Sequence, residues 1–249
     1  MNSSPQKILI LGATSAIAQA IARKFAGPKV HFLLAARDEA KLDAVARDLI
    51  ERTSCQTTNW IGDLSDTSQH ADLLKKSKEK LGSIDLALLA YGMLPDQDNI
   101  KNDAQAVLDS LQTNFNSAAA LLTRLGTIFE KQCSGTIAVI TSVAADRGRK
   151  SIYIYGAAKA GLSAFTDGLR GRMLPFGVQV LNIKPGIIDT PMTAGLKKGL
   201  LASTTDKVAA DVQTAIRKKQ DILYTPRMWR LIMFIIRHIP EKIFKKLSI

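Results

Sequence analysis

The sequence predicts a doubly wound α/β fold: one parallel sheet of about seven strands, helices on both faces, and a basic, amphipathic C-terminal tail. Three observations predict it. Short Leu-rich or β-branched runs alternate with longer segments of helical period, nearly every run is apolar on both faces, and no repeat or long linker interrupts the series. The 249 residues suit one large domain.

The order of the predicted elements gives right-handed βαβ units. The strand-like runs are residues 7–12, 30–36, 57–62, 84–90, 135–142 and 178–183. The helix-like stretches are residues 15–25, 39–52, 65–81, 104–132 and 155–174. We expect residues 1–225 to form the dinucleotide-binding and catalytic domain, and residues 226–249 to form an extension that belongs to the same domain or contacts a membrane surface or another subunit.

Composition excludes several classes of protein. Cys55 and Cys133 lie far apart and no N-terminal signal pattern is present, so a reducing cytoplasm is expected. The three histidines lack acidic or thiol neighbours at ligand spacing, so we expect no metal site. The net charge of +12 fits an anionic ligand, a membrane surface or nucleic acid. No basic-aromatic groove pattern or reading helix is present, which argues against nucleic acid.

The first strand leads into a turn that can bind a dinucleotide. Gly12 ends the strand, and the backbone amides of residues 14–17 open the following helix and can point at phosphate. Ala16 and Ala18 stand where two further glycines are usual, and each adds only a methyl group. A strand followed by a small-residue helix is also common in other α/β proteins. The residues assigned to the pyrophosphate are Gly12, Thr14, Ser15, Ala16 and Ile17.

Two residues at later strand ends bear on the adenosine half of the cofactor. Arg37 lies about 20 residues past the turn, and its guanidinium suits a ribose 2'-phosphate, which favours NADP over NAD. The alternative is a solvated residue at a helix start. Asp63 can accept from an adenine amino group or cap a helix that begins near Ser65.

A second group of residues points to proton transfer. Tyr155 and Lys159 are four residues apart, hence on one helix face, whereas Tyr153 points elsewhere. The ammonium is expected to lower the phenol's pKa from about 10 toward the working range. Ser142 ends a strand at the ligand-binding edge of the sheet, where its hydroxyl can hold a carbonyl oxygen. Asn114 is a polar residue amid apolar neighbours and must find partners.

With these residues, the chain resembles the short-chain dehydrogenase/reductase family in its single-domain, Rossmann-like form. The resemblance runs from about Lys7 to Tyr224 and includes the turn, the Tyr-x-x-x-Lys pair and the segment KPGIIDTPM at residues 184–192. The chain departs from the family at the two turn alanines and at residues 89–92, where Leu-Ala-Tyr-Gly replaces the usual Asn-Asn-Ala-Gly.

The resemblance implies an oxidoreductase that interconverts a ketone and a secondary alcohol. Tyr155 would be the general acid/base, and Lys159 would lower its pKa and bind the nicotinamide ribose. Ser142 would polarise the substrate oxygen, and Asn114 would order a water in the proton relay. The remaining residues assigned to the cofactor are Leu64, Ala90, Gly92, Pro185, Gly186, Ile188 and Thr190.

One branch of the family is especially similar: the reductase component of decaprenylphosphoryl-ribose 2'-epimerase. The similarity lies in LGATSAIA, LLAYGML, residues 141–162 and the ending RLIMFIIRHIPEKIFKKLSI. It implies reduction of a 2-keto sugar carried on a polyprenyl phosphate for the cell wall, after a separate oxidase makes the ketone, by a homo-oligomer. The alternatives are a cytoplasmic reductase of a soluble ketone, steroid or 3-oxoacyl thioester, and a cofactor-binding regulator.

Two basic segments bear on this substrate. Arg147, Arg149 and Lys150 lie between Ser142 and Tyr155, where they can meet a substrate phosphate or form a solvated loop. Residues 191–205 contain two glycines and are typical of a mobile lid.

The C-terminal tail combines basic and apolar residues. From residue 217 to 249, nine Lys/Arg against two acids give a local charge of +7. The longest apolar run in the tail, residues 231–236, is far too short to span a bilayer. The tail can lie in the headgroup layer or pack on another subunit. We therefore expect a cytoplasmic protein bound peripherally at the inner face of the membrane.

Overall fold

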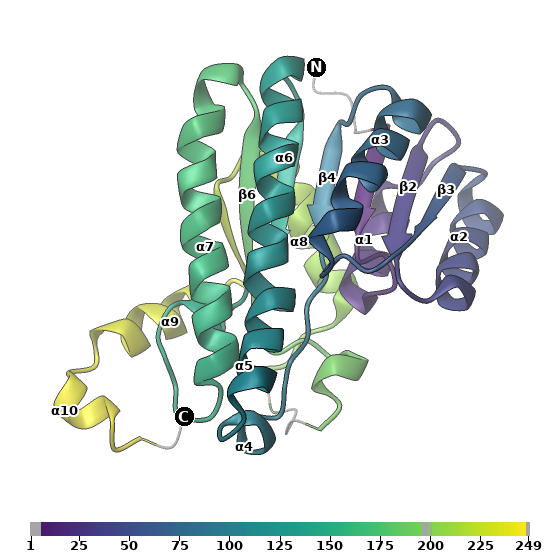
Figure 1. Cartoon of the computed structure of the whole chain (residues 1–249). Helices are drawn as coiled ribbons and strands as arrows, with labels where there is room; N and C mark the ends of the chain where they lie inside the picture. The colour runs from purple at the N-terminus through teal and green to yellow at the C-terminus, as the bar shows by residue number, and fades with distance from the viewer. Residues whose placement is uncertain (1–5, 196–198, 200, 248–249) are drawn as a thin grey trace.

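A computed structural model describes residues 6–195, 199 and 201–247, and a seven-stranded parallel sheet forms its centre (Figure 1). The strands are β1 (Lys7–Leu11), β2 (His31–Ala36), β3 (Gln56–Ile61), β4 (Leu86–Leu89), β5 (Thr136–Ile140), β6 (Gln179–Pro185) and β7 (Ile222–Thr225). Their order is β3-β2-β1-β4-β5-β6-β7, and every neighbouring pair is parallel. The predicted doubly wound fold is confirmed.

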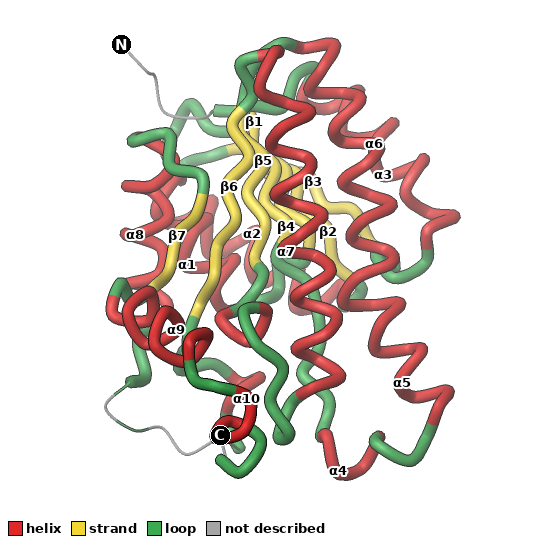
Figure 2. The backbone as a smooth tube through the Cα atoms, turned by 90° about the vertical axis from the view of Figure 1, so that its left-hand side faces the viewer, coloured by secondary structure: helices red, strands yellow, loops and turns green. Residues whose placement is uncertain are grey.

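Helices cover both faces of the sheet, as Figure 2 shows edge-on. One face carries α1 (Ala16–Phe25), α2 (Glu39–Thr53) and α8 (Thr205–Arg217), and the other carries α3 (His70–Leu81), α6 (Ser117–Gln132) and α7 (Tyr153–Met173). Because strand side chains alternate, Ile8 and Ile10 join the core on the first face and Leu9 and Leu11 join the core on the second. This double burial explains the continuous apolar runs.

The helix predicted over residues 104–132 is interrupted. It consists of α5 (Ala104–Leu111), a π-helical turn at Gln112–Asn116, and α6. The wider turn contains Asn114, which is buried and hydrogen-bonds outside its own helix. The helix predicted over residues 65–81 likewise begins with a separate 3₁₀ turn, Thr67–Gln69, before α3.

The chain continues past β7 into α9 (Met228–His238) and α10 (Glu241–Phe244), which project beside the carboxyl ends of the strands (Figure 1). Trp229 and Met233 are buried, whereas Leu231, Phe234 and Ile235 of the same helix are exposed. Among the described residues, no helix is long and apolar enough to cross a bilayer. The projecting segment therefore has one face packed on the domain and one apolar face open to its surroundings.

The predicted lid, residues 191–205, is described only in part. It begins with a 3₁₀ turn at Pro191–Thr193, and Ser203 pairs with the backbone of Ile187 and Asp189. Residues 196–198 and 200 lie outside the described residues. The mobility predicted for this segment stays a prediction.

Candidate active site

One cavity of about 900 Å³ lies at the carboxyl ends of the strands. It includes the ends of β1 and β4, between which the strand order reverses, and this is where open α/β sheets bind ligands. Every residue assigned above to catalysis, cofactor or substrate lines it except Arg147 and Lys150. The sheet thus gathers residues from Gly12 to Thr190 into one site.

Three of the proposed catalytic residues lie just after β5, at Ser142, and on α7, at Tyr155 and Lys159. The Ser142 hydroxyl accepts from the Ala144 backbone N–H at 3.0 Å and also hydrogen-bonds the Tyr155 phenol. Lys159 is 4% exposed, and its ammonium donates to the Ile140 carbonyl at 3.2 Å. The Lys159 Nζ lies 5.8 Å from the centroid of the Tyr155 ring. Strand end and helix face therefore bring hydroxyl, phenol and ammonium together.

The pKa of Tyr155 differs from the expectation. Burial raises it to about 12, because the phenolate is desolvated and the hydrogen bond with Ser142 offsets only part of that cost. Burial also lowers the pKa of Lys159 to about 8. The predicted lowering of the phenol's pKa is therefore wrong for this arrangement, since desolvation is the largest cause of the shift and raises the pKa. A neutral phenol at pH 7 is the protonation state that a proton donor needs.

Asn114 lies against the same centre. Its Oδ1 accepts from the Met93 backbone N–H at 2.9 Å, and its Nδ2 donates to Ser110 at 3.3 Å. A Cβ at Gly92 would lie 2.7 Å from that Oδ1 and 3.4 Å from the Lys159 ammonium. Glycine at residue 92 therefore allows the amide and the ammonium to approach each other.

The turn after β1 fits a dinucleotide despite its alanines. Gly12 has φ +90°, and a Cβ there would lie 2.7 Å from the Tyr91 backbone N. The turn and residue 91, where the chain departs from the family's usual sequence, are therefore in close contact. Tyr91 is held by a 3.1 Å hydrogen bond with Ser117. Ala18 is fully buried in the core under α1, where a small residue is needed for the helix to cross the sheet. Ala16 lines the cavity beside the helix N-terminus.

Arg37 follows the end of β2 and lines the cavity. It is exposed and makes no hydrogen bond or ion pair with the residues that the structure describes. The neighbouring Asp38 caps α2 and pairs with Lys41 at 2.9 Å.

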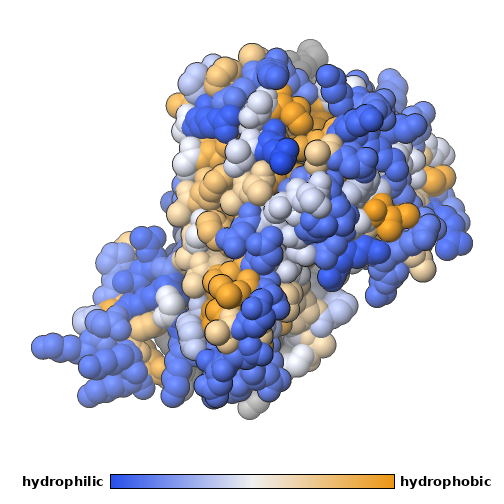
Figure 3. Space-filling model, viewed as in Figure 1, coloured by the Kyte–Doolittle hydropathy of each residue, from blue (hydrophilic) through white to orange (hydrophobic). Residues whose placement is uncertain are grey.

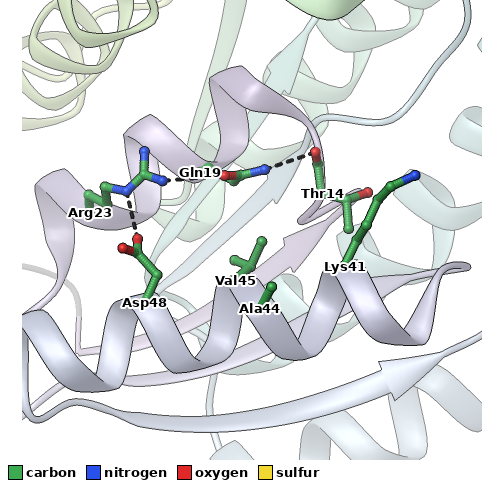
Figure 4. Close-up of a pocket in the computed structure, with 7 residues that line it drawn as sticks. All are labelled: Thr14, Gln19, Arg23, Lys41, Ala44, Val45 and Asp48. Carbon is green, nitrogen blue, oxygen red and sulfur yellow. Dashed lines mark hydrogen bonds and ion pairs between the residues drawn. The ribbon is translucent and has the colours of Figure 1, made fainter.

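A smaller pocket of about 320 Å³ between α1 and α2 shares Thr14 with the cavity (Figure 4). Arg23 in this pocket pairs with Asp48 at 2.8 Å. Its cations, Arg23 and Lys41, are thus matched by carboxylates.

Asp63 does not cap a helix. Its Oδ1 accepts from the Ser65 backbone N–H at 2.9 Å within a turn, and Asp66 caps the 3₁₀ turn that follows. The capping alternative for Asp63 is therefore wrong, while its carboxylate lines the cavity as the adenine alternative requires.

Arg147 does not line the cavity, in contrast to the prediction. Its guanidinium donates to the carbonyls of Ile236 and Ile239 at 2.6 and 2.7 Å, at the C-terminus of α9. It also pairs with Glu241 at 2.8 Å and lies 3.6 Å from the Phe244 ring centroid. Helix C-termini attract cations, and the tail returns to this loop only in the folded chain. Arg147 therefore anchors the tail, and only Arg149 of the two predicted arginines lines the cavity.

The cavity lining includes residues that sequence reasoning did not assign to the site, among them Gln97 of the short helix α4 (Gln97–Ile100) and Trp229 of α9. Trp229 was assigned with the rest of the tail to a surface role. Its burial against Val143, next to Ser142, depends on the tertiary position of α9. No sequence pattern distinguished it from its exposed neighbours.

The fold and this site define an oxidoreductase. The family model "short chain dehydrogenase" matches residues 6–200, and the chain belongs to the short-chain dehydrogenase family. An uncharacterized oxidoreductase of Streptomyces coelicolor is 31% identical over 248 residues, which cover 98% of this chain and 97% of that protein. One of Mycobacterium tuberculosis is 29% identical over 240 residues, covering 96% of each.

Two solved structures share the fold. A short-chain dehydrogenase from Sphingobium yanoikuyae, in complex with NADPH, superposes with a TM-score of 0.81 at 21% identity, covering 95% of this chain and 97% of that chain. A bulky-bulky ketone specific alcohol dehydrogenase from Comamonas testosteroni gives a TM-score of 0.79 at 21% identity, covering 96% of each.

Replacing Arg147 with Ala is expected to release α9 and α10, because it removes every contact described above between that guanidinium and the tail. Limited trypsin digestion should cleave at Arg237 or Lys242 about ten-fold faster or more, since local opening governs cleavage. Arg172→Ala, which removes surface contacts with Glu130 and Thr127 and none with the tail, should leave this rate unchanged. Equal tail cleavage in Arg147→Ala and the wild type would contradict the anchoring role.

Proposed function

We propose that the protein is an NADPH-dependent reductase that converts a ketone into a secondary alcohol, and that its substrate is a 2-keto sugar on a polyprenyl phosphate. The observation that carries the reductase proposal is the meeting of Ser142, Tyr155 and the buried Lys159 in one cavity. The overall reaction consumes the ketone, NADPH and one proton and yields the alcohol and NADP.

The chain's own residues account for the movement of the proton. A bound nicotinamide cofactor supplies a hydride to the carbonyl carbon. The Ser142 Oγ accepts from the Ala144 backbone N–H and hydrogen-bonds the Tyr155 phenol, so the two hydroxyls are placed to hold one substrate oxygen. The neutral Tyr155 phenol donates its proton to that oxygen as negative charge develops there. The Lys159 ammonium then stabilises the phenolate, and Asn114 beside it orders the water that restores the proton.

The preference for NADPH rests on the end of β2. Ala36 brings no carboxylate to hold a ribose 2'-hydroxyl, and the adjacent Asp38 is occupied by Lys41. The open guanidinium of Arg37 suits a 2'-phosphate. The turn at Gly12, with Thr14 to Ile17, would hold the pyrophosphate, and Pro185, Gly186, Ile188 and Thr190 would contact the nicotinamide half.

The substrate proposal rests on the resemblance to the epimerase reductase branch and on Arg149. Burial lowers the pKa of Arg149, and its guanidinium lines the cavity between the proposed catalytic residues. An anion is the partner that such a group needs. A separate oxidase would supply the ketone. The working form is a homo-oligomer.

The tail would hold the enzyme at the membrane that carries such a substrate. The exposed apolar residues of α9 and α10 are Met228, Leu231, Phe234, Ile235 and Ile243. Basic residues flank them, and Figure 3 shows hydrophilic side chains gathered over this projecting segment. Apolar insertion combined with basic flanks is the pattern of a peripheral membrane contact.

The pH dependence of reduction tests the catalytic assignment. With saturating NADPH, kcat/KM should be constant below pH 8 and fall as pH rises through about 8, the pKa of Lys159, because the ammonium is lost while Tyr155 stays protonated. Lys159→Arg should remove this fall, since guanidinium keeps its charge. A wild-type profile that stays flat to pH 10, or an equal fall in the arginine variant, would show the assignment to be wrong.

Cofactor choice tests Arg37. Arg37→Ala should weaken NADPH binding by about ten-fold or more while leaving NADH binding unchanged, because one charge-assisted phosphate contact is lost. Titration of intrinsic fluorescence measures both affinities. Arg23→Ala, whose guanidinium pairs with Asp48, serves as the control and should leave both affinities unchanged. The assignment fails if Arg37→Ala weakens the two cofactors equally.

Vesicle binding separates the lipid-linked substrate from a soluble one. The protein should sediment with phosphatidylglycerol vesicles and stay in the supernatant with phosphatidylcholine vesicles. Phe234→Asp should abolish sedimentation, whereas Leu174→Asp, at an exposed leucine outside the tail, should not. A wild-type chain that never sediments supports the soluble-ketone or 3-oxoacyl thioester alternative, and a change of oligomeric state in Phe234→Asp would instead assign the tail to a subunit contact.

A further inference from the structure

The cavity contains buried hydrogen-bond donors that have no partner. Within the described residues, five buried side-chain atoms lack a hydrogen bond, and three of them belong to residues that line the cavity: Gln97 Nε2, Arg149 Nε and Trp229 Nε1. All three are N–H donors. Buried polar groups in proteins are generally paired, so three unpaired donors around one cavity call for a ligand that brings acceptors.

Trp229 is the clearest of the three. Its indole is 4% exposed and packs in a cluster with Val143, the residue after Ser142. The N–H lies against the backbone of Gly186, where an added Cβ would be 1.9 Å away. Trp60, the chain's other tryptophan, is equally buried, yet its Nε1 donates to Asp72 at 2.8 Å. The fold thus satisfies one buried indole and leaves the indole beside the cavity unsatisfied.

Gln97 is oriented by the chain itself. Its Oε1 accepts from the backbone N–H of Ile154 at 3.1 Å, next to Tyr155, so the amide nitrogen must be the atom left without a partner. Arg149 lies on the loop that leads into α7. The three donors therefore come from α4, this loop and α9. Gln97 contacts the residue before Tyr155, Trp229 packs on the residue after Ser142, and Arg149 lies on the loop that joins Ser142 to α7.

Carboxylates that line the same cavity do not satisfy these donors. Asp96 accepts from the backbone N–H groups of Asp98 and Asn99, and Asp98 pairs with Lys101 at 2.7 Å. Asp63 accepts from Ser65. None of these carboxylates accepts from Gln97 Nε2, Arg149 Nε or Trp229 Nε1, and the three donors remain for a bound molecule.

We propose that Gln97, Arg149 and Trp229 form a donor site for the oxygen atoms of an oxygen-rich, anionic ketone, such as a sugar bearing a phosphate. This rests on the proposed reductase function and assigns the recognition of the substrate's oxygen atoms to these three residues. A hydrocarbon ketone has one acceptor, which Ser142 and Tyr155 already engage, and would leave the three donors unpaired. A polyhydroxylated substrate with a phosphate has acceptors enough for all of them. Arg147 is a positioning residue, because it anchors the helix that carries Trp229.

Three probes of matched carbon number test the site: D-ribulose 5-phosphate, D-ribulose and 2-pentanone. Binding of the two sugars to the enzyme with NADP is measured by calorimetry, and turnover of all three with NADPH by absorbance. Trp229→Phe keeps the ring and removes the donor, and Gln97→Glu keeps the acceptor for Ile154 and removes the donor. Their controls are Trp60→Phe, at the satisfied indole, and Asn99→Asp, which adds the same charge on the same helix outside the cavity lining.

The wild type should bind D-ribulose 5-phosphate more tightly than D-ribulose, and 2-pentanone should be the least efficiently reduced of the three ketones. Each donor variant should weaken sugar phosphate binding by about ten-fold or more. The same variant should lower kcat/KM for 2-pentanone by a smaller factor, and the control variants should match the wild type in both measurements. Donor variants that behave like the controls, or a wild type that binds neither sugar, would overturn the site. Sugar binding that depends on the donors, without NADPH oxidation, would support the donor site and contradict the reductase function. NADPH oxidation with 2-pentanone alone would support the reductase function and contradict the donor site.

Discussion

The burial of the Lys159 ammonium is the constraint on which the rest of the site depends. A cation that is 4% exposed needs polar contacts, and the chain supplies the Ile140 carbonyl at the end of β5. That contact joins the helix carrying Tyr155 to the end of β5, two residues before Ser142. It also fixes the space beside Gly92, into which Asn114 brings its amide from the π-helical turn. The electrostatic environment of the phenol is therefore set by where one helix meets one strand.

The loop between Ser142 and Tyr155 links this centre to the tail. Asp146 accepts from the Lys184 ammonium at 2.6 Å and from the Tyr224 hydroxyl at 2.7 Å, which ties the loop to β6 and β7. Arg147, the next residue, holds the C-terminus of α9. Trp229 on that helix then reaches the cavity wall. A segment that interacts with a lipid surface would thus be connected to the substrate end of the site through two adjacent charged residues.

Patterns that repeat along the chain were predictable, and contacts between distant segments were not. The apolar runs predicted the parallel sheet because a strand that is buried on both faces needs consecutive apolar residues. The spacing of Tyr155 and Lys159 placed them on one helix face. The direction of the phenol's pKa was missed, since desolvation depends on the whole fold. Arg147 was assigned to substrate for the same reason: its partners lie about ninety residues away. The π-helical turn at Asn114 and the cavity position of Trp229 had no local signal.

Comparison of Tyr155→Phe with Tyr153→Phe tests the central chemical claim most directly. Both phenols lie on α7, but Tyr153 is 47% exposed and does not line the cavity, so its loss controls for the removal of a hydroxyl from this helix. Rates of NADPH oxidation are measured for both variants with a ketone that the wild type reduces. If Tyr155 delivers the proton, its variant should lose about 10²-fold or more of the wild-type kcat, and Tyr153→Phe should match the wild type. Near-normal turnover by Tyr155→Phe would contradict the account.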